Sequence, residues 1–157
     1  MITVHQPKVL SRNLILYDGD SPVGEIRFQY LGTGAEIVVG STMYEGVRRG
    51  WFKNAYEISR GSAVVATAEP IGFWQRSYEV RTGNATFTLR RQKGWFKIGW
   101  NLFDGDSQVG TMTRTGVFRT QTEGTFDDSI DTATRIFVIW IANAIWQQDQ
   151  AAAAAAG

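Results

Sequence analysis

The sequence predicts an all-β protein: a closed antiparallel barrel of about 10–12 strands in hairpin meander order, enclosing a hydrophobic α-helix near the C-terminus. Two observations carry this prediction. A hairpin-like unit recurs every 22 residues in the middle of the chain, and the segment 136–146 is apolar on every side. The composition agrees, since 13% of the 157 residues are aromatic and 17 are glycine. Aromatic residues favour strands and glycine favours turns.

The first half of the predicted barrel consists of hairpins that follow a short lead, residues 1–12. The strands 14–17 and 23–28 flank the turn Asp18-Gly19-Asp20-Ser21. An Asp-Gly pair between two apolar runs is a strong hairpin signal, and Pro22 suits a strand start or an edge. Two further strands are expected at 35–39 and 43–47, on either side of Gly40 and Ser41.

The second half repeats itself. A glycine followed by a pair of aromatic or apolar residues marks the start of each unit, and another glycine follows 11 residues after the first three. Fixed-period self-similarity is typical of stacked or meandering supersecondary units, so each unit is interpreted as two strands joined by a turn. The unit-start glycines are Gly50, Gly72, Gly94 and Gly116, and the turn glycines are Gly61, Gly83 and Gly105.

The apolar segment predicts a buried helix over about 129–148, because a helix without a polar stripe must be covered on all sides. Asp127, Asp128 and Ser129 are the expected N-terminal cap and first turn, and Asn143 should need a hydrogen-bond partner. About a dozen apolar residues are too few for a bilayer, which needs roughly 20, so we expect no transmembrane span. The alternatives are a membrane anchor and a hairpin solenoid with the helix on its outside.

These elements define one domain, residues 1–150, followed by an alanine-rich tail over 151–157. A sheet of this size tends to curl, and closure removes its exposed edges. A barrel wider than eight strands has room for more than its own side chains. The apolar helix is the expected filler.

Hairpins of this kind followed by a short hydrophobic C-terminal helix resemble the Tubby C-terminal-like superfamily. This group includes the tubby domain, the phospholipid scramblases and the plant LURP-one-related proteins. The resemblance is carried by Tyr17 to Gly24, by its near copy Phe103 to Gly110, and by the segment 131–146. It implies a 12-stranded barrel around a central helix, and a lipid-linked function. Tubby's phosphoinositide-binding residues find no matching positions here, so the resemblance assigns no site residues.

Few residues suit catalysis or metal binding. The chain has no cysteine, which excludes disulfides and thiolate chemistry, and its only histidine is His5. The paired aspartates at 18/20 and 104/106 fall in predicted turns, where aspartate is favoured for backbone reasons; a weak shared cation site is the alternative. We therefore expect a protein that is not an enzyme, with no catalytic residues, no metal and no cofactor.

Two clusters combine basic and aromatic residues at junctions between hairpins, and both should lie at one end of the barrel. Arginine and lysine attract anionic head groups at about 1 kcal/mol each, and tryptophan suits a membrane interface. Alternatively, the charges solvate a rim while the aromatics belong to the core. The candidate lipid-binding residues are Arg48, Arg49, Trp51, Lys53, Arg90, Arg91, Lys93, Trp95 and Lys97.

The predicted function is a non-enzymatic module that binds anionic phospholipid or phosphoinositide head groups, or otherwise associates with a membrane. The alternatives are a structural or protein-interaction domain, with a protein partner and no small ligand, and scramblase-like lipid movement. A net charge of +1 gives no basis for nucleic-acid binding. The N-terminal residues lack the apolar region of a signal peptide, so we expect a cytoplasmic protein, either free in the cytoplasm or peripheral at the cytoplasmic face of a membrane.

Overall fold

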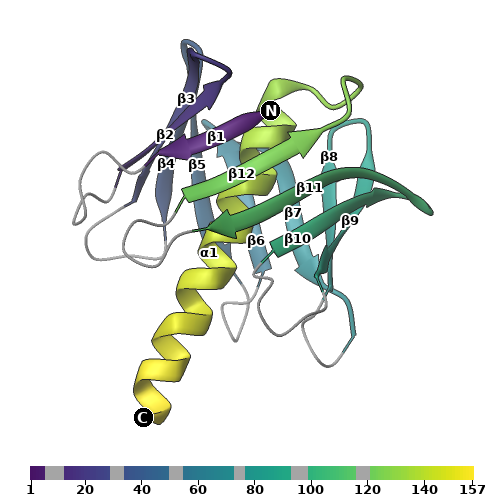
Figure 1. Cartoon of the computed structure of the whole chain (residues 1–157). Helices are drawn as coiled ribbons and strands as arrows, with labels where there is room; N and C mark the ends of the chain where they lie inside the picture. Colours follow the sequence, from purple (N-terminus) through teal and green to yellow (C-terminus); the bar gives the residue numbers. More distant parts are fainter. Residues whose placement is uncertain (6–12, 29–33, 50–54, 73–76, 93–98, 116–120) are drawn as a thin grey trace.

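A computed structural model places twelve antiparallel strands in a closed barrel, with one C-terminal helix running through it (Figure 1). The structure describes residues 1–5, 13–28, 34–49, 55–72, 77–92, 99–115 and 121–157. Each strand pairs with its neighbours in sequence, and β1 closes the ring by pairing with β12. The predicted fold class is therefore confirmed, and the solenoid alternative is wrong.

The strands are short, and glycine turns join many of them. Gly19 and Gly105 both have φ near +60°, a conformation that glycine adopts without steric cost. The strands are β1 (Ile2–His5), β2 (Asn13–Asp18), β3 (Ser21–Phe28), β4 (Ala35–Val39), β5 (Thr42–Arg49), β6 (Ala55–Arg60), β7 (Ala63–Pro70), β8 (Ser77–Thr82), β9 (Thr86–Arg91), β10 (Gly99–Asp104), β11 (Ser107–Thr115) and β12 (Gln121–Phe126).

The 22-residue period of the sequence is the period of the barrel wall. Strands β6, β8, β10 and β12 begin at residues 55, 77, 99 and 121. The second residue of the first three is a buried aromatic, Tyr56, Tyr78 or Trp100. These rings meet edge to face around the wall, at centroid distances of 6.1 Å for the first pair and 5.9 Å for the second. The repeat thus places one aromatic layer inside the barrel.

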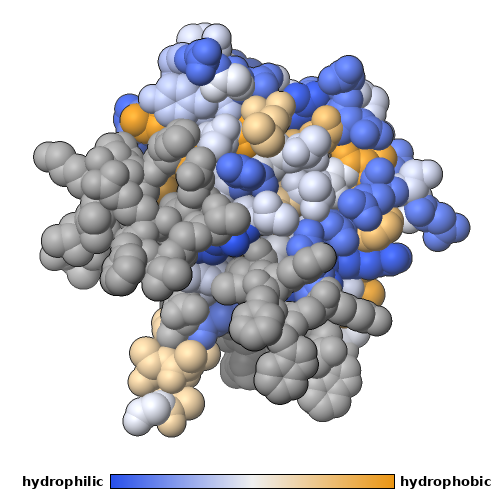
Figure 2. All heavy atoms as spheres, in the orientation of Figure 1, coloured by the Kyte–Doolittle hydropathy of each residue, from blue (hydrophilic) through white to orange (hydrophobic). Residues whose placement is uncertain are grey.

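The helix α1 (Thr132–Ala156) fills the barrel with its first half. Residues 136–145 are all buried, and Trp140 is only 1% exposed. The buried Asn143 donates to the carbonyl of Ile139 at 2.9 Å, which provides the partner that the sequence required. The prediction of an enclosed helix is confirmed. The chain's alanine run continues the helix rather than forming a separate tail, and it stands clear of the barrel, light orange in Figure 2.

Two local predictions were wrong. The helix cap is Asp131, whose carboxylate accepts from the backbone N–H of Thr134 at 2.9 Å, and the first turn holds no acidic residue. Asp127 to Ser129 instead form the turn that leads from β12 to the helix. The lead also contains a strand, β1, because the alternating Ile2 and Val4 are buried against the core.

Candidate functional site

The barrel has two different ends. The odd-numbered strands finish at the end where the helix leaves the barrel, which we call the helix-exit end (Figure 1). We call the opposite end the turn end. There β2 finishes at Asp18, β10 finishes at Asp104, and the helix begins. Arg48 and Arg49 close strand β5, while Arg90 and Arg91 close strand β9. Because β5 and β9 run in the same direction, both arginine pairs lie at the helix-exit end, as the sequence predicted.

Strand alternation divides each arginine pair between the two faces of the wall. Arg48 is opposite the buried Tyr56, and Arg91 is opposite the buried Trp100, so both lie on the inner face. Arg49 and Arg90 lie on the outer face. Arg49 forms an ion pair with Glu57 at 3.5 Å, and the guanidinium of Arg90 lies 4.6 Å from the ring centroid of Phe103. The inner face of the helix-exit end is therefore lined by arginine.

The two inner arginines have different partners. Arg91 forms an ion pair with Asp149 of the helix at 2.6 Å and lies 5.1 Å from the ring centroid of Trp100. Arg48 forms no ion pair with any described residue, and its buried Nε has no hydrogen-bond partner. A guanidinium nitrogen in this state retains its full capacity to donate to an anionic oxygen.

Tyrosines beside these arginines link the wall to the helix. The hydroxyl of Tyr56 donates to Gln148 Oε1 at 3.0 Å. Burial raises the pKa of Tyr56, and it also raises the pKa of Tyr78. The positive charges of Arg48 and Arg91 act in the opposite direction on Tyr78. Both arginines thus lie close enough to the same tyrosine to affect its titration.

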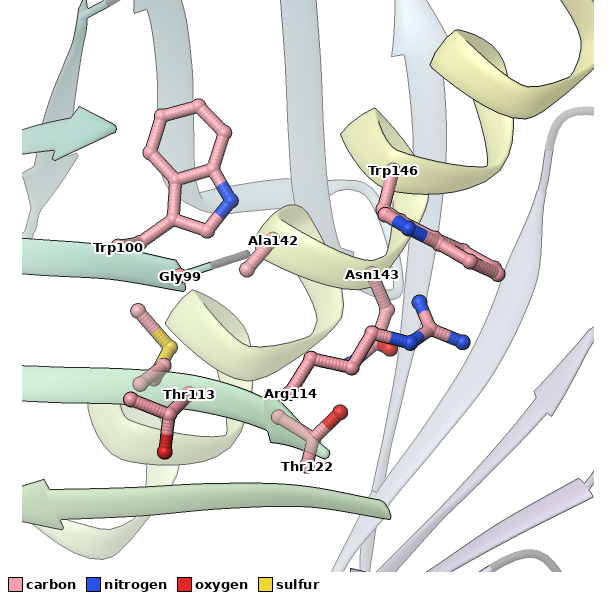
Figure 3. A pocket seen from close by; sticks show the side chains of 9 residues that line it. Gly99, Trp100, Thr113, Arg114, Thr122, Ala142, Asn143 and Trp146 are labelled. Carbon is pink, nitrogen blue, oxygen red and sulfur yellow. The ribbon is translucent and has the colours of Figure 1, made fainter. Parts of the chain in front are cut away.

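A third inner arginine, Arg114 of β11, was not among the predicted site residues. It lines a small pocket between the wall and the helix, together with Trp146 (Figure 3). The sequence does indicate that Arg114 faces inward. Gly110, Met112 and Arg114 are spaced two residues apart, so they lie on the same face of the strand. The pocket is lined by Gly99, Trp100, Met112, Thr113, Arg114, Thr122, Ala142, Asn143 and Trp146.

The structure does not place every predicted residue. Trp51, Lys53, Lys93, Trp95 and Lys97 lie outside the described residues. Within the described ranges, no three His, Asp or Glu side chains are grouped so that they could hold a metal ion. Among the described residues, no helix is both long enough and apolar enough to cross a membrane.

Comparisons with protein-family models, with curated proteins and with solved structures give no match to this chain. The 12-stranded barrel around a central helix is the architecture that the Tubby C-terminal-like resemblance implies. Membership of that superfamily stays a prediction.

Proposed function

We propose that this domain binds anionic phospholipid head groups at the helix-exit end of the barrel. The observation that carries the proposal is the convergence of Arg48 and Arg91 on the inner face of that end, with Arg48 Nε left without a partner. Phosphate oxygens are suitable acceptors because the planar guanidinium offers five donors and is always charged near neutral pH.

The outer face of the same end adds to the attraction. Arg90 forms no ion pair within the described ranges, and Arg49 is 63% exposed despite its contact with Glu57. Cations close to a negatively charged membrane contribute about 1 kcal/mol each. Four arginines at one end would therefore orient the barrel with the helix-exit end toward the lipid.

Co-sedimentation with vesicles tests this proposal directly. Vesicles of phosphatidylcholine alone are compared with vesicles that also contain phosphatidylserine or a phosphoinositide, at low and at high salt. Binding confined to the anionic vesicles, and lost at high salt, supports the proposal. Equal binding to both, or to neither, overturns it and favours a protein-interaction domain. Competition by soluble inositol phosphate, but not by inorganic phosphate, would identify the head group as the recognised source of phosphate.

Matched double variants locate the binding site. Arg48→Gln with Arg91→Gln should weaken binding to anionic vesicles about thirtyfold, since each charge contributes about 1 kcal/mol. The control is Arg60→Gln with Arg81→Gln, which removes the same charge from exposed positions at the turn end. Equal weakening in the two double variants would show that net charge alone drives binding.

A further inference from the structure

Arg114 is a cation held inside the wall of the barrel. Its guanidinium carbon lies 3.0 Å from the ring centroid of Trp146, and its Nε and Nη1 are buried with no hydrogen-bond partner (Figure 3). The side chain extends from β11 toward the helix, because Arg114 follows the buried Met112 on the inner face of the strand. Trp146 Nε1 is also buried without a partner. Three donor nitrogens on two touching residues therefore have no acceptor.

The charge of Arg114 is not balanced by any described residue. Burial lowers the pKa of Arg114 to about 10, so the guanidinium remains protonated at neutral pH. It forms no ion pair in the described part of the chain, and the carboxylate of Asp149 on the helix is paired with Arg91. Removing an unpaired cation from water is unfavourable, and the neutral face of an aromatic ring offsets only part of that cost.

A small pocket lies beside these donors. Its volume is about 20 Å³, which is enough for one water-sized particle. Its walls are apolar at Trp100, Met112 and Ala142, and the Asn143 amide donates to the helix backbone. A water molecule could accept two of the free N–H bonds, but it would leave the positive charge unbalanced.

We propose that this pocket is a binding site for a small monovalent anion of halide size, with chloride as the ordinary occupant. The anion accepts from Arg114 and Trp146 and neutralises the guanidinium, which lets β11 pack closely against the helix. The site differs from the proposed head-group site in its donors, which are Arg114 and Trp146 rather than Arg48 and Arg91, so either proposal can fail without the other.

Thermal unfolding in matched salts tests the inference. The protein is titrated with sodium chloride against sodium gluconate at constant ionic strength, because gluconate is a monovalent anion much larger than chloride. We expect a saturable rise in Tm of about 3–6 °C at a chloride concentration about ten times the dissociation constant. Identical melting in both salts throughout the titration would overturn the proposal.

Two variants separate the pocket from chloride binding elsewhere. Arg114→Met should abolish the difference between chloride and gluconate. Trp146→Phe keeps the aromatic face against Arg114 but removes one donor to the anion, so its chloride midpoint should rise about tenfold. If Arg114→Met does not fold, the chloride midpoint of Trp146→Phe tests the proposal. An unchanged midpoint in Trp146→Phe, or a chloride response that persists in Arg114→Met, would refute the assignment.

The head-group proposal provides the control. Arg48→Gln with Arg91→Gln should retain the full chloride response, since neither residue lines the pocket. Conversely, Trp146→Phe should bind anionic vesicles as the wild-type protein does. A double variant that lost both properties would show that the two sites are one.

Discussion

Gly46 of strand β5 and Trp140 of the helix fit together so closely that no other side chain can replace the glycine without displacement. A Cβ at position 46 would lie 2.8 Å from both Cη2 and Cζ2 of the indole. The same indole meets the ring of Tyr56 nearly perpendicularly, at a centroid distance of 5.8 Å. The barrel wall is thus shaped for the largest side chain on the helix.

The first prediction follows from this contact. Gly46→Ala should lower the free energy of unfolding by about 1–3 kcal/mol, because an added methyl group in a close-packed core forces its neighbours to move. Urea denaturation measures the change. The control is Gly83→Ala, where a Cβ would meet nothing within 4 Å, and which should stay within about 0.5 kcal/mol of the wild type. Equal stability of the two variants would contradict the close fit.

The second prediction concerns the start of the helix. Asp131→Ala should cost about 1 kcal/mol of stability, because the Asp131 carboxylate accepts from the N–H and the hydroxyl of Thr134. Asp128→Ala is the matched control, since Asp128 is exposed and lies before the cap. Chemical denaturation of both variants decides which aspartate is the cap. A larger loss at position 128 would restore the interpretation drawn from the sequence.

The third prediction is a pH dependence. Tyr56→Phe removes the hydrogen bond to Gln148, which should cost about 1 kcal/mol near neutral pH. Burial raises the pKa of Tyr56 in the folded state, while tyrosine in the unfolded chain titrates near pH 10, so the wild type is stabilised by this proton below about pH 10. As the pH rises further, the wild type should lose this contribution by about 1.4 kcal/mol per unit. The gap between wild type and variant should therefore close.

A matched variant isolates the proton from the hydrogen bond. Gln148→Ala removes the acceptor and keeps the Tyr56 hydroxyl, so its stability should fall with pH in parallel with the wild type. Unfolding curves between about pH 9 and about pH 11 compare the three proteins across the range where free tyrosine titrates. A constant gap between wild type and Tyr56→Phe would show that the proton on Tyr56 is not held more tightly in the folded state.

The fourth prediction uses the ion pair between Arg91 and Asp149. Asp149→Asn should bind anionic vesicles about fivefold more tightly, because it removes a negative charge and frees Arg91 to meet a head group. Stability should change by less than about 1 kcal/mol, since both side chains are largely exposed. Asp104→Asn at the turn end is the control for net charge and should bind as the wild type does. Equal gains in the two variants would remove Arg91 from the site.

Much of the fold could be predicted because repetition makes strand boundaries visible. The spacing of Tyr56, Tyr78 and Trp100 matched the period of the strands, and an apolar segment without a polar stripe had to be enclosed. The cap was harder, because Asp127, Asp128 and Asp131 all suit a helix start by residue type. Asp131 is the cap because Ile130 is buried in the core and a turn precedes it. Neither feature is visible in the sequence.

The site was only partly predictable. The clustering of Arg48, Arg49, Arg90 and Arg91 indicated that these arginines would gather at one end of the barrel, but it could not show which member of each pair faces inward. That choice depends on strand register, which the opposing residues Tyr56 and Trp100 determine. Arg114 was not predicted as a site residue because it is distant in sequence from the basic clusters. Its guanidinium packs on the ring of the helix residue Trp146, which lies 32 positions later in the sequence.

The meeting of β1 with β12 has a consequence for biosynthesis. A ribosome produces the first eleven strands of the wall before it produces β12, which completes the ring, and it produces the helix that occupies the interior only after β12. During that interval the inner faces of the early hairpins have no partner, and exposed apolar strands are prone to aggregate. The nascent chain should therefore need chaperones most before β12 and the helix have been made, and ring closure should be a slow, long-range association of β1 with β12.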